Sequence, residues 1–265
     1  QGFSPVVIDS ASEFEREGYL LALNEQIGQK VAEKMELLDQ LREFEVPLTK
    51  NVMYDDSGGQ LLRFEMDHRT LNTRVGLMLN RADLHATLYE AVNDTVEFRM
   101  GQEITSIQET TDAATVTFSS GETETYDLVI GADGMHSRVR ELVFGKEFPK
   151  YMGHAYFAFI TSNQELYERI AVSEAILIRG DGFTIAYHRL QGNEIGAYVF
   201  HRDDAVEKIA PDQRREHMLS KYGRFDPNFE AILEGMKEGE HVFYDGFTQI
   251  VMPAWHKGRI CLIGD

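Results

Sequence analysis

The segment DLVIGADGMHSRVR, residues 127–140, decides the fold that the sequence predicts. It opens with an apolar, β-branched run and closes on glycine and aspartate, which predicts a buried strand with Asp133 at its end. The segment GRICLIGD, residues 258–265, repeats this pattern and ends in Asp265. Open α/β sheets bind ligands at such strand ends, so we expect both carboxylates to lie at a binding site.

The chemistry of these carboxylates indicates the kind of ligand. An ionised carboxylate only accepts hydrogen bonds, so it suits sugar or polyol hydroxyls and repels a phosphate that nothing neutralises. We therefore expect a long, sugar-bearing cofactor. Downstream of Asp133, Ser137 is placed to cap a helix whose apolar positions are Val139, Leu142 and Val143. Backbone amides at that helix start can face an anionic group.

Composition narrows the class of protein. The 265 residues are 43% hydrophobic and 26% charged, which is typical of a globular protein with one long domain or two ordinary ones. A net charge of -18 disfavours nucleic acid as a partner. The single Cys261 excludes an internal disulfide, and no apolar stretch reaches the length of a membrane span. No leader pattern is present at the start, so we expect a cytoplasmic protein.

The first residues resemble the middle of a nucleotide-binding unit. The run QGFSPVVIDSA predicts a strand that ends at Asp9. In a dinucleotide-binding βαβ unit, the acid at the end of the second strand takes the ribose hydroxyls, and Asp9 fits that position. The glycine-rich turn that precedes such a strand is absent from this sequence.

The rest of the chain alternates helical and strand-like stretches. Residues 18–44 read as mainly helical, the DDSGG turn at 55–59 predicts a β-hairpin, and Asn80 with Asp83 predicts a capped helix. Strands at 96–99, 104–108 and 114–118 are expected to form a β-meander. From about residue 150 to 251, four strand-like runs and two later helices predict an antiparallel sheet with helices; they cover 154–161, 174–179, 183–190, 194–202, 211–222 and 228–237.

Together, GADGMHSRVR, GRICLIGD and the upstream LNRADLHATL resemble the single-component FAD-dependent monooxygenases. These aromatic-hydroxylase-like flavoproteins include tetracycline-inactivating enzymes, and the resemblance spans nearly the whole chain. It implies an α/β fold: a Rossmann-like FAD-binding domain with a parallel sheet and a β-meander, and an inserted α+β substrate domain built on an antiparallel sheet. The implied FAD-binding parts are 1–50, 75–148 and 251–265; the implied substrate parts are the hairpin at 51–74 and residues 149–250.

The resemblance also implies cofactor contacts. Asp9 would bind the adenosine ribose, Arg81 at its helix start would reach the cofactor, and Asp265, after Gly264, would accept from the ribityl hydroxyls of FAD. The remaining implied residues match the motif that serves both FAD and the nicotinamide cofactor NAD(P)H: Gly131, Asp133, Gly134, Ser137 and Arg140.

Each of these assignments has a simpler alternative. Asp9 and Asp133 sit beside turns, where aspartate is common for local reasons. Arg81 can be a solvated arginine, although the positive end of a helix slightly disfavours a cation there. Arg140 can equally serve as a structural ion-pair partner for the turn.

Residues of the antiparallel strands are candidates for a substrate pocket. Alternate residues of a strand face one side, so Tyr156, Tyr187, Arg189 and Tyr198 are candidate pocket residues, although the register is not readable from the sequence. No HxH, HExxH or CxxC spacing occurs, so we predict no metal site, and GxSxG is absent.

The function that the resemblance implies is an NAD(P)H-dependent FAD monooxygenase. It would use O2, through a C4a-hydroperoxyflavin, to hydroxylate a hydrophobic aromatic or polycyclic small molecule. Two alternatives stay open: a flavin-dependent reductase of isoprenoid-type double bonds, and a flavin-binding protein without turnover. A halogenase is disfavoured because Trp255 is the single tryptophan.

This sequence also departs from the family at its two ends. The family's glycine-rich fingerprint would precede Gln1, and a further segment would follow Asp265. We therefore expect an interior part of a larger protein, which by itself binds FAD weakly or not at all and is inactive.

Overall fold

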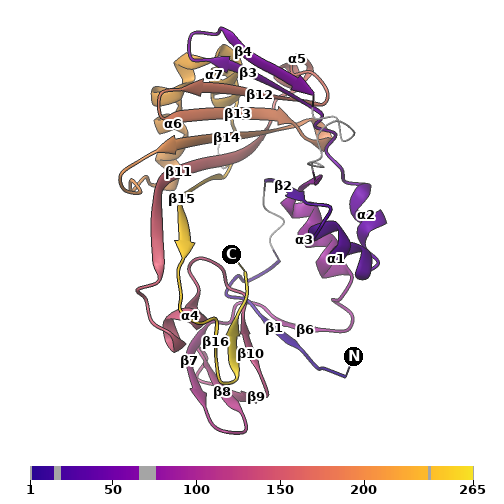
Figure 1. The fold of residues 1–265 in the computed structure, drawn as a ribbon, viewed down its shortest axis with the longest axis vertical. Coiled ribbons are helices and arrows are strands. Elements are labelled where there is room, and N and C mark those ends of the chain that lie inside the picture. The colour runs from indigo at the N-terminus through magenta and orange to yellow at the C-terminus, as the bar shows by residue number, and fades with distance from the viewer. Residues whose placement is uncertain (1, 15–18, 66–75, 238–239, 265) are drawn as a thin grey trace. The chain divides into compact units, whose positions relative to one another are not determined.

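The computed structural model describes residues 2–14, 19–65, 76–237 and 240–264 (Figure 1). Contacts divide the chain into two compact units. Unit 1 comprises Gln1–Glu15, Val92–Met152 and Phe247–Asp265, and unit 2 comprises Arg16–Ala91 and Gly153–Gly246. Residues 16–50 and 75–91 thus group with the antiparallel sheet, whereas the sequence assigns them to FAD binding; that functional assignment stays a prediction.

Unit 1 joins strands that are far apart in the sequence. Strand β1 (Val6–Ile8) pairs in parallel with β6 (Glu97–Arg99), and β10 (Val129–Gly131) pairs in parallel with β17 (Ile260–Leu262). Strand β16 (His256–Lys257) runs antiparallel to β17. The two motif segments therefore lie side by side, as the sequence predicts. Gly131 is required there, because a Cβ atom would lie 2.6 Å from Leu262 Cδ2 and 2.9 Å from Val139 Cβ.

The β-meander differs from the prediction in one strand. It consists of β7 (Ile104–Glu109), β8 (Ala114–Phe118) and β9 (Thr123–Tyr126). The prediction that residues 96–99 belong to it is wrong, because β6 pairs with β1 instead. Strand β9 escaped prediction because TETY has no apolar run. The meander packs on the motif strands through a core that includes Val116, Phe118, Val139 and Ile260.

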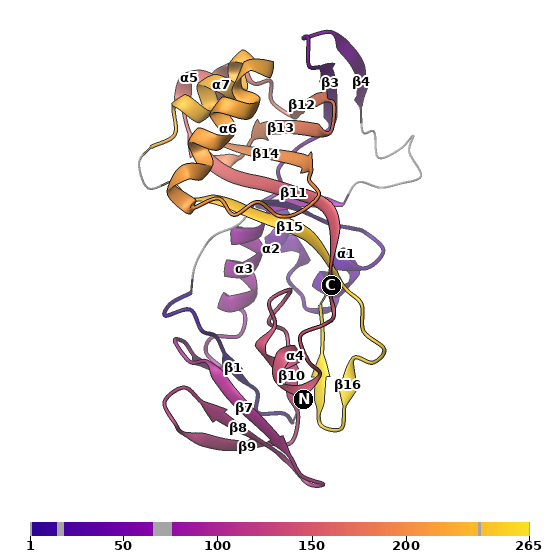
Figure 2. The ribbon, with the colours of Figure 1, turned by 90° about the vertical axis from the view of Figure 1, so that its left-hand side faces the viewer.

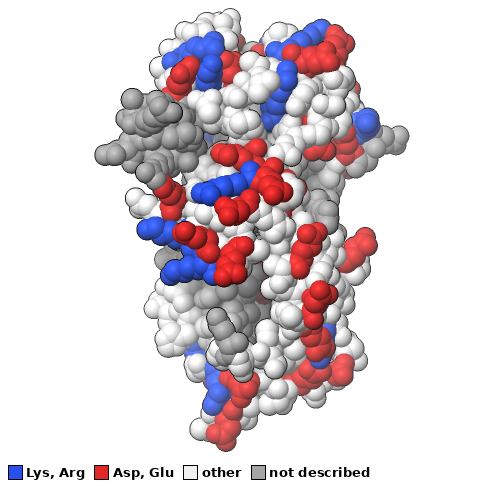
Figure 3. Space-filling model, turned by 90° about the vertical axis from the view of Figure 1, so that its right-hand side faces the viewer, with Lys and Arg blue, Asp and Glu red and all other residues white. Residues whose placement is uncertain are grey.

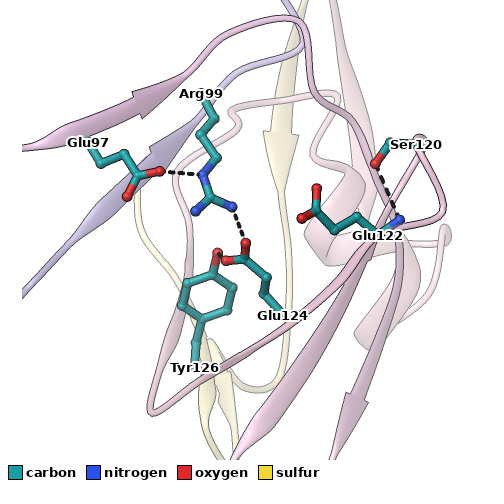
Figure 4. A network of polar contacts seen from close by, with 6 residues as sticks. All are labelled: Glu97, Arg99, Ser120, Glu122, Glu124 and Tyr126. Atoms are coloured by element: carbon teal, nitrogen blue, oxygen red, sulfur yellow. Dashed lines mark hydrogen bonds and ion pairs between the residues drawn. The ribbon is translucent and has the colours of Figure 1, made fainter.

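A charged network connects the two sheets that hold β6 and β9 (Figure 4). Arg99 donates from Nε to Glu97 Oε1 at 2.7 Å and from Nη1 to Glu124 Oε1 at 2.6 Å. Tyr126 donates its hydroxyl to Glu124 Oε2 at 2.7 Å. The Arg99 bond, then the Tyr126 bond, lowers the pKa of Glu124, while burial and the Glu124 bond raise the pKa of Tyr126 to about 12. The main-chain carbonyl of Arg99 also accepts from Asp9 N at 3.1 Å, so the residue that anchors the network is bonded to the end of β1.

Unit 2 is built on a seven-stranded sheet. Its hairpin, β3 (Lys50–Asp55) and β4 (Gln60–Glu65), surrounds the DDSGG turn as predicted, and β3 pairs in parallel with β12. In sheet order the other strands are β15 (Val242–Ile250), β11 (Pro149–Ser162), β14 (Glu194–Arg202), β13 (Phe183–Arg189) and β12 (Glu174–Gly180).

Helices cover one face of this sheet (Figure 2). They are α5 (Gln164–Arg169), α6 (Arg214–Tyr222) and α7 (Pro227–Glu234), with short 3₁₀ turns η1 (Gln191–Asn193), η2 (Pro211–Gln213) and η3 (Gly223–Phe225). Alternation along the strands decides which side chains face the helices. The core on that side includes Phe157, Phe159, Tyr187, Ile195, Val199, Met218, Phe229 and Ile232.

The segment before the hairpin is only partly helical. Helices α1 (Gly28–Lys34) and α2 (Leu38–Arg42) lie within the predicted stretch, but β2 (Leu20–Leu23) precedes them and pairs with β5 (Leu77–Asn80). The prediction of helix is therefore wrong at 20–23, since the short run LLAL fits strand and helix equally and its partner is distant. Helix α3 (Arg81–Glu90) begins at the predicted cap, where Asn80 Oδ1 accepts from Ala82 N at 3.0 Å.

Replacement of Phe159 by alanine tests the helix-covered core. Phe159 is 2% exposed, so Phe159→Ala should lower the free energy of unfolding of unit 2 by about 3–5 kcal/mol. Phe200, which is 36% exposed on the opposite face, is the matched control, and Phe200→Ala should cost clearly less. Urea unfolding of both variants measures the difference; equal losses would contradict this account of the core.

Candidate functional site

The turn after β10 is held by its own side chains. Helix α4 (Arg138–Val143) begins at Ser137, whose Oγ accepts from Arg140 N at 2.9 Å, which confirms the predicted cap. The Asp133 carboxylate accepts from the Ser137 hydroxyl with Oδ1 and from Val139 N at 2.9 Å with Oδ2. Asp133 therefore stabilises the helix start, as its simpler reading expects. A carboxylate has about four acceptor positions, so two stay open to a ligand.

Arg140 holds the same turn from the other direction. Its side chain is buried, and its Nη1 and Nη2 donate to the carbonyls of Gly134 at 3.3 Å and Met135 at 2.7 Å. Among the described residues its Nε has no hydrogen-bond partner. Arg140 therefore stabilises the turn by donating to main-chain carbonyls. Among the described residues it forms no ion pair, although the sequence suggested one as an alternative role.

A small pocket opens beside this turn, within unit 1. Its volume of about 20 Å³ is room for about one water molecule. Gly134 lines it with φ of +70° and with no atom within 4 Å of a Cβ position, so this side of the glycine is open. The structure brings together five predicted site residues here, with apolar neighbours that the sequence did not single out; the lining is Gly131, Asp133, Gly134, Ser137, Arg140, Ile250, Trp255, Leu262 and Ile263.

The other predicted cofactor residues lie elsewhere. Asp9 follows β1 and is exposed; its Oδ1 accepts from Ala11 N at 2.9 Å, which is a local turn contact. Gly264 is exposed with φ of +116°, and Asp265 lies outside the described residues. Arg81 belongs to unit 2, where its exposed side chain donates from Nε to His85 Nε2 at 3.3 Å. Their roles toward the cofactor stay predictions.

The face of the seven-stranded sheet opposite its helices carries a row of aromatic rings, which we call the aromatic face. Tyr198 and Phe200 lie with centroids 6.1 Å apart and planes 5° apart, and Tyr156 lies 6.1 Å from Phe200. Phe243 is 5.3 Å from Tyr156, and Tyr19 is 5.4 Å from Phe243. Of the predicted pocket residues, the structure brings Tyr156 and Tyr198 together here.

Tyr187 and Arg189 lie on the opposite, helix-covered face. Tyr187 is 1% exposed and donates its hydroxyl to Asp226 Oδ1, at the start of α7, at 3.1 Å. The Arg189 guanidinium lies 4.4 Å from the centre of the Tyr167 ring on α5. The register explains this difference. Tyr187 is opposite Ala197, whereas Tyr198 is opposite Ala186, so the two tyrosine side chains point to opposite faces of the sheet.

Several members of these sites were missed from the sequence. Phe200 could have been found, because it lies two residues from Tyr198 on one strand and therefore on the same face. Trp255 lies three residues before the quoted segment GRICLIGD and was considered only as the single tryptophan. Tyr19 and Phe243 gave no local signal, since their elements meet the sheet only through distant pairing.

A larger cavity of about 340 Å³ lies in unit 2. None of the predicted site residues lines it; it is bounded by Phe44, Val46, Asn80, Asp83, Leu190, Gln191, Gly192 and Glu194. Burial, followed by the nearby Asp83, raises the pKa of Glu194. The predicted site and this larger cavity are therefore separate features.

Further properties of the described residues are their surface charge, their potential to cluster as metal ligands and the suitability of their helices for crossing a membrane. On the face drawn in Figure 3, the described basic side chains lie next to acidic ones rather than forming a broad basic area. In the described part of the chain, no group of three His, Cys, Asp or Glu side chains gathers as metal ligands. No helix of the described residues has the length and apolar character to cross a bilayer.

The paired parallel strands, the meander and the turn from Gly131 to Gly134 that leads into a capped helix are typical of an α/β protein of the nucleotide-binding class. Comparison with known families is consistent with this class: the model described as FAD binding domain matches residues 31–265. The chain belongs to this family of FAD-binding monooxygenases.

Individual relatives agree. The chain is 29% identical over its whole length to a flavin-dependent monooxygenase of Legionella longbeachae serogroup 1, of which it covers 68%. It is 26% identical, over 71% of its length, to the 3-hydroxybenzoate 6-hydroxylase of Klebsiella oxytoca, of which it covers 48%.

Solved structures share the fold. The tetracycline destructase Tet(51) superposes on the whole chain with a TM-score of 0.77 at 24% identity, with 68% of that protein covered. Klebsiella pneumoniae HpxO, solved with FAD and uric acid, gives a TM-score of 0.79 at 20% identity over 97% of this chain and 65% of that one.

Removal of the Ser137 hydroxyl tests the turn. Ser137→Ala deletes the helix cap and one donor to Asp133, so it should lower the free energy of unfolding of unit 1 by about 1 kcal/mol or somewhat more. Ser120 is the matched control, because its Oγ also accepts one backbone N–H, from Glu122 at 3.3 Å, in an exposed meander turn (Figure 4). Urea unfolding that ranks Ser120→Ala as the more damaging change would refute this role of Ser137.

Proposed function

We propose that the protein containing this chain is an NAD(P)H-dependent FAD monooxygenase that hydroxylates a hydrophobic aromatic or polycyclic small molecule. The observation that carries the proposal is the pocket at the turn of residues 131–140, where a buried guanidinium meets open main chain. Membership in the FAD-binding monooxygenase family supports the reaction class.

The residues that line this pocket offer donors and acceptors that suit one part of FAD, while the pocket itself has room for about one water molecule. Arg140 is buried with an unpartnered Nε among the described residues, and a buried charge without a counter-charge is costly. An anionic group of the cofactor near this guanidinium would remove that cost. The space at the Cβ position of Gly134 is open, and the Asp133 carboxylate can accept further hydrogen bonds from hydroxyls of the same ligand.

The chain's own residues then have distinct tasks. The turn of residues 131–140 binds and orients the cofactor, because its conformation is already fixed by Asp133, Ser137 and Arg140. Ile250, Trp255 and Leu262 form the apolar side of the pocket. When bound, FAD would supply the electron transfer from NAD(P)H and the activation of O2.

The aromatic face of unit 2 supports the choice of substrate class. Its near-parallel rings offer a flat apolar surface on which another aromatic ring can stack. Burial, then the nearby Asp245, raises the pKa of Tyr156, so its hydroxyl stays protonated and can donate to a polar substituent. Relatives named for 3-hydroxybenzoate and 6-hydroxynicotinate support an aromatic substrate.

Replacement of Arg140 tests cofactor binding. Because flavin quenches nearby indole emission, titration of the complete protein with FAD should quench Trp255, which lines the pocket. Loss of a charge-assisted bond should weaken FAD binding by Arg140→Met about tenfold or more. Arg138, two residues away and bonded to Glu141, is the matched control, and Arg138→Met should leave FAD affinity nearly unchanged. FAD affinity that Arg140→Met does not reduce would argue against this site.

Turnover tests the reaction. The complete protein with FAD, NADPH and O2 should consume NADPH and form a hydroxylated product from at least one member of a panel of phenols and fused-ring aromatics. Tyr156→Ala should raise the KM for that substrate about tenfold by removing a stacking partner. Phe64→Ala, on the outer strand β4, is the control and should leave KM unchanged. NADPH oxidation that yields only hydrogen peroxide across the panel would count against hydroxylation.

A further inference from the structure

The helix-covered face of unit 2 contains a cluster of titratable side chains around Phe157, which we call the histidine cluster. His201 on β14 and Tyr244 on β15 lie on the sheet, with near-parallel rings 6.2 Å apart. His217 and Tyr222 come from α6, and the Phe157 ring lies 5.7 Å from His201 and 5.8 Å from His217. Tyr222 lies 6.0 Å from His201, so α6 meets the sheet through these rings.

Several buried polar atoms of this cluster have no hydrogen-bond partner among the described residues. His201 is 4% exposed and Tyr222 is 2% exposed. Within the described chain, His201 Nδ1, His217 Nε2 and the Tyr222 hydroxyl lack hydrogen-bond partners. Each such buried group costs about 1–3 kcal/mol, so the cluster is a weak point in an otherwise apolar layer.

Charged groups surround the cluster without contacting the histidines closely. His201 Nε2 is 3.9 Å from Asp203 Oδ2, and His217 Nε2 is 4.0 Å from Glu207 Oε2, both too long for hydrogen bonds. The remaining charged neighbours are basic: Lys221 on α6 acts on both histidines, and Arg214 lies 6.0 Å from the centre of the Tyr244 ring.

We propose that the histidine cluster is an acid-released latch: its neutral imidazoles hold α6 on the sheet, and protonation of His201 and His217 loosens that helix. A proton on either ring adds a positive charge to a buried, largely apolar layer, which is costly because no carboxylate of the described residues is within hydrogen-bond distance. Asp203 and Glu207 would have to move closer to compensate, while Lys221 opposes the added charge.

The direction of the effect follows from burial. Burial lowers the pKa of His201, and Lys221 lowers it further; burial also lowers the pKa of His217. The folded state therefore binds these protons less readily than the unfolded chain does. The stability of the attached helix is fully present above about pH 6.5, the ordinary histidine value, and is lost as the pH falls through the folded pKa values.

The latch also bears on the aromatic face, and this consequence rests on the proposed function. Phe157 and His201 alternate with Tyr156 and Phe200 along β11 and β14. A loosened α6 would therefore loosen the strands that carry the rings of the aromatic face.

Hydrogen exchange measured by mass spectrometry tests the latch independently of catalysis. Amides of α6 in the purified protein should exchange about tenfold faster at about pH 5.5 than at about pH 7.5, after correction for the intrinsic rate. Amides of β8 in unit 1 serve as the internal reference. His201→Phe and His217→Gln each remove one titrating ring and should each reduce the acid effect. His256→Gln, at an exposed position of unit 1, should leave it unchanged.

Each result decides the matter. Exchange in α6 that is independent of pH, or slower in acid, would overturn the proposal, as would an undiminished acid effect in both variants. If His201→Phe does not fold, His217→Gln alone still decides, because its side chain is partly exposed and tolerates a polar replacement. A protein that shows the acid effect but no FAD-dependent turnover would retain the latch and lose the proposed function.

Discussion

The structure of unit 1 depends on the reciprocal bonding of one turn. Asp133 binds forward to the start of α4, and Arg140 binds back to the carbonyls of Gly134 and Met135. Both side chains thereby bond to the turn itself, which fixes the main chain between them. A cofactor would then meet a turn that is already formed, so little ordering entropy would oppose binding. The distant Arg99 network adds a second fixed point, at the end of β1.

Unit 2 depends on a different constraint, the alternation of side chains along its central strands. Odd-numbered residues of β11 and β14, such as Phe157 and Val199, pack under the helices, while even-numbered residues, such as Tyr156 and Tyr198, form the aromatic face. One sheet thus provides an apolar core on one side and a surface of aromatic rings on the other. His201 and Tyr244 lie on the helix side of this division, whereas the buried His188 lies 5.8 Å from Tyr198 on the other side.

Features with local causes could be predicted from the sequence. Asn80 and Ser137 cap helices through atoms two or three residues away, and the apolar motif strands form β10 and β17. Features that need a distant partner could not be predicted. The pairing of β6 with β1, the strand nature of residues 20–23 and the placement of Tyr187 all depend on register between remote segments. The carbonyl contacts of Arg140 also depend on a turn conformation that spacing alone does not specify.

The alternation of side chains along β14 has a consequence for how this protein can change in evolution. Phe200, which is 36% exposed, can accept a new side chain with little effect on packing, because Val199 and His201 on either side of it bear the contact with the helices. Under the proposed function, substrate preference and folding therefore depend on alternate residues of the same strand. Insertion of a single residue in β14 would move its helix-side residues to the aromatic face and its aromatic residues to the core, so both faces would be lost.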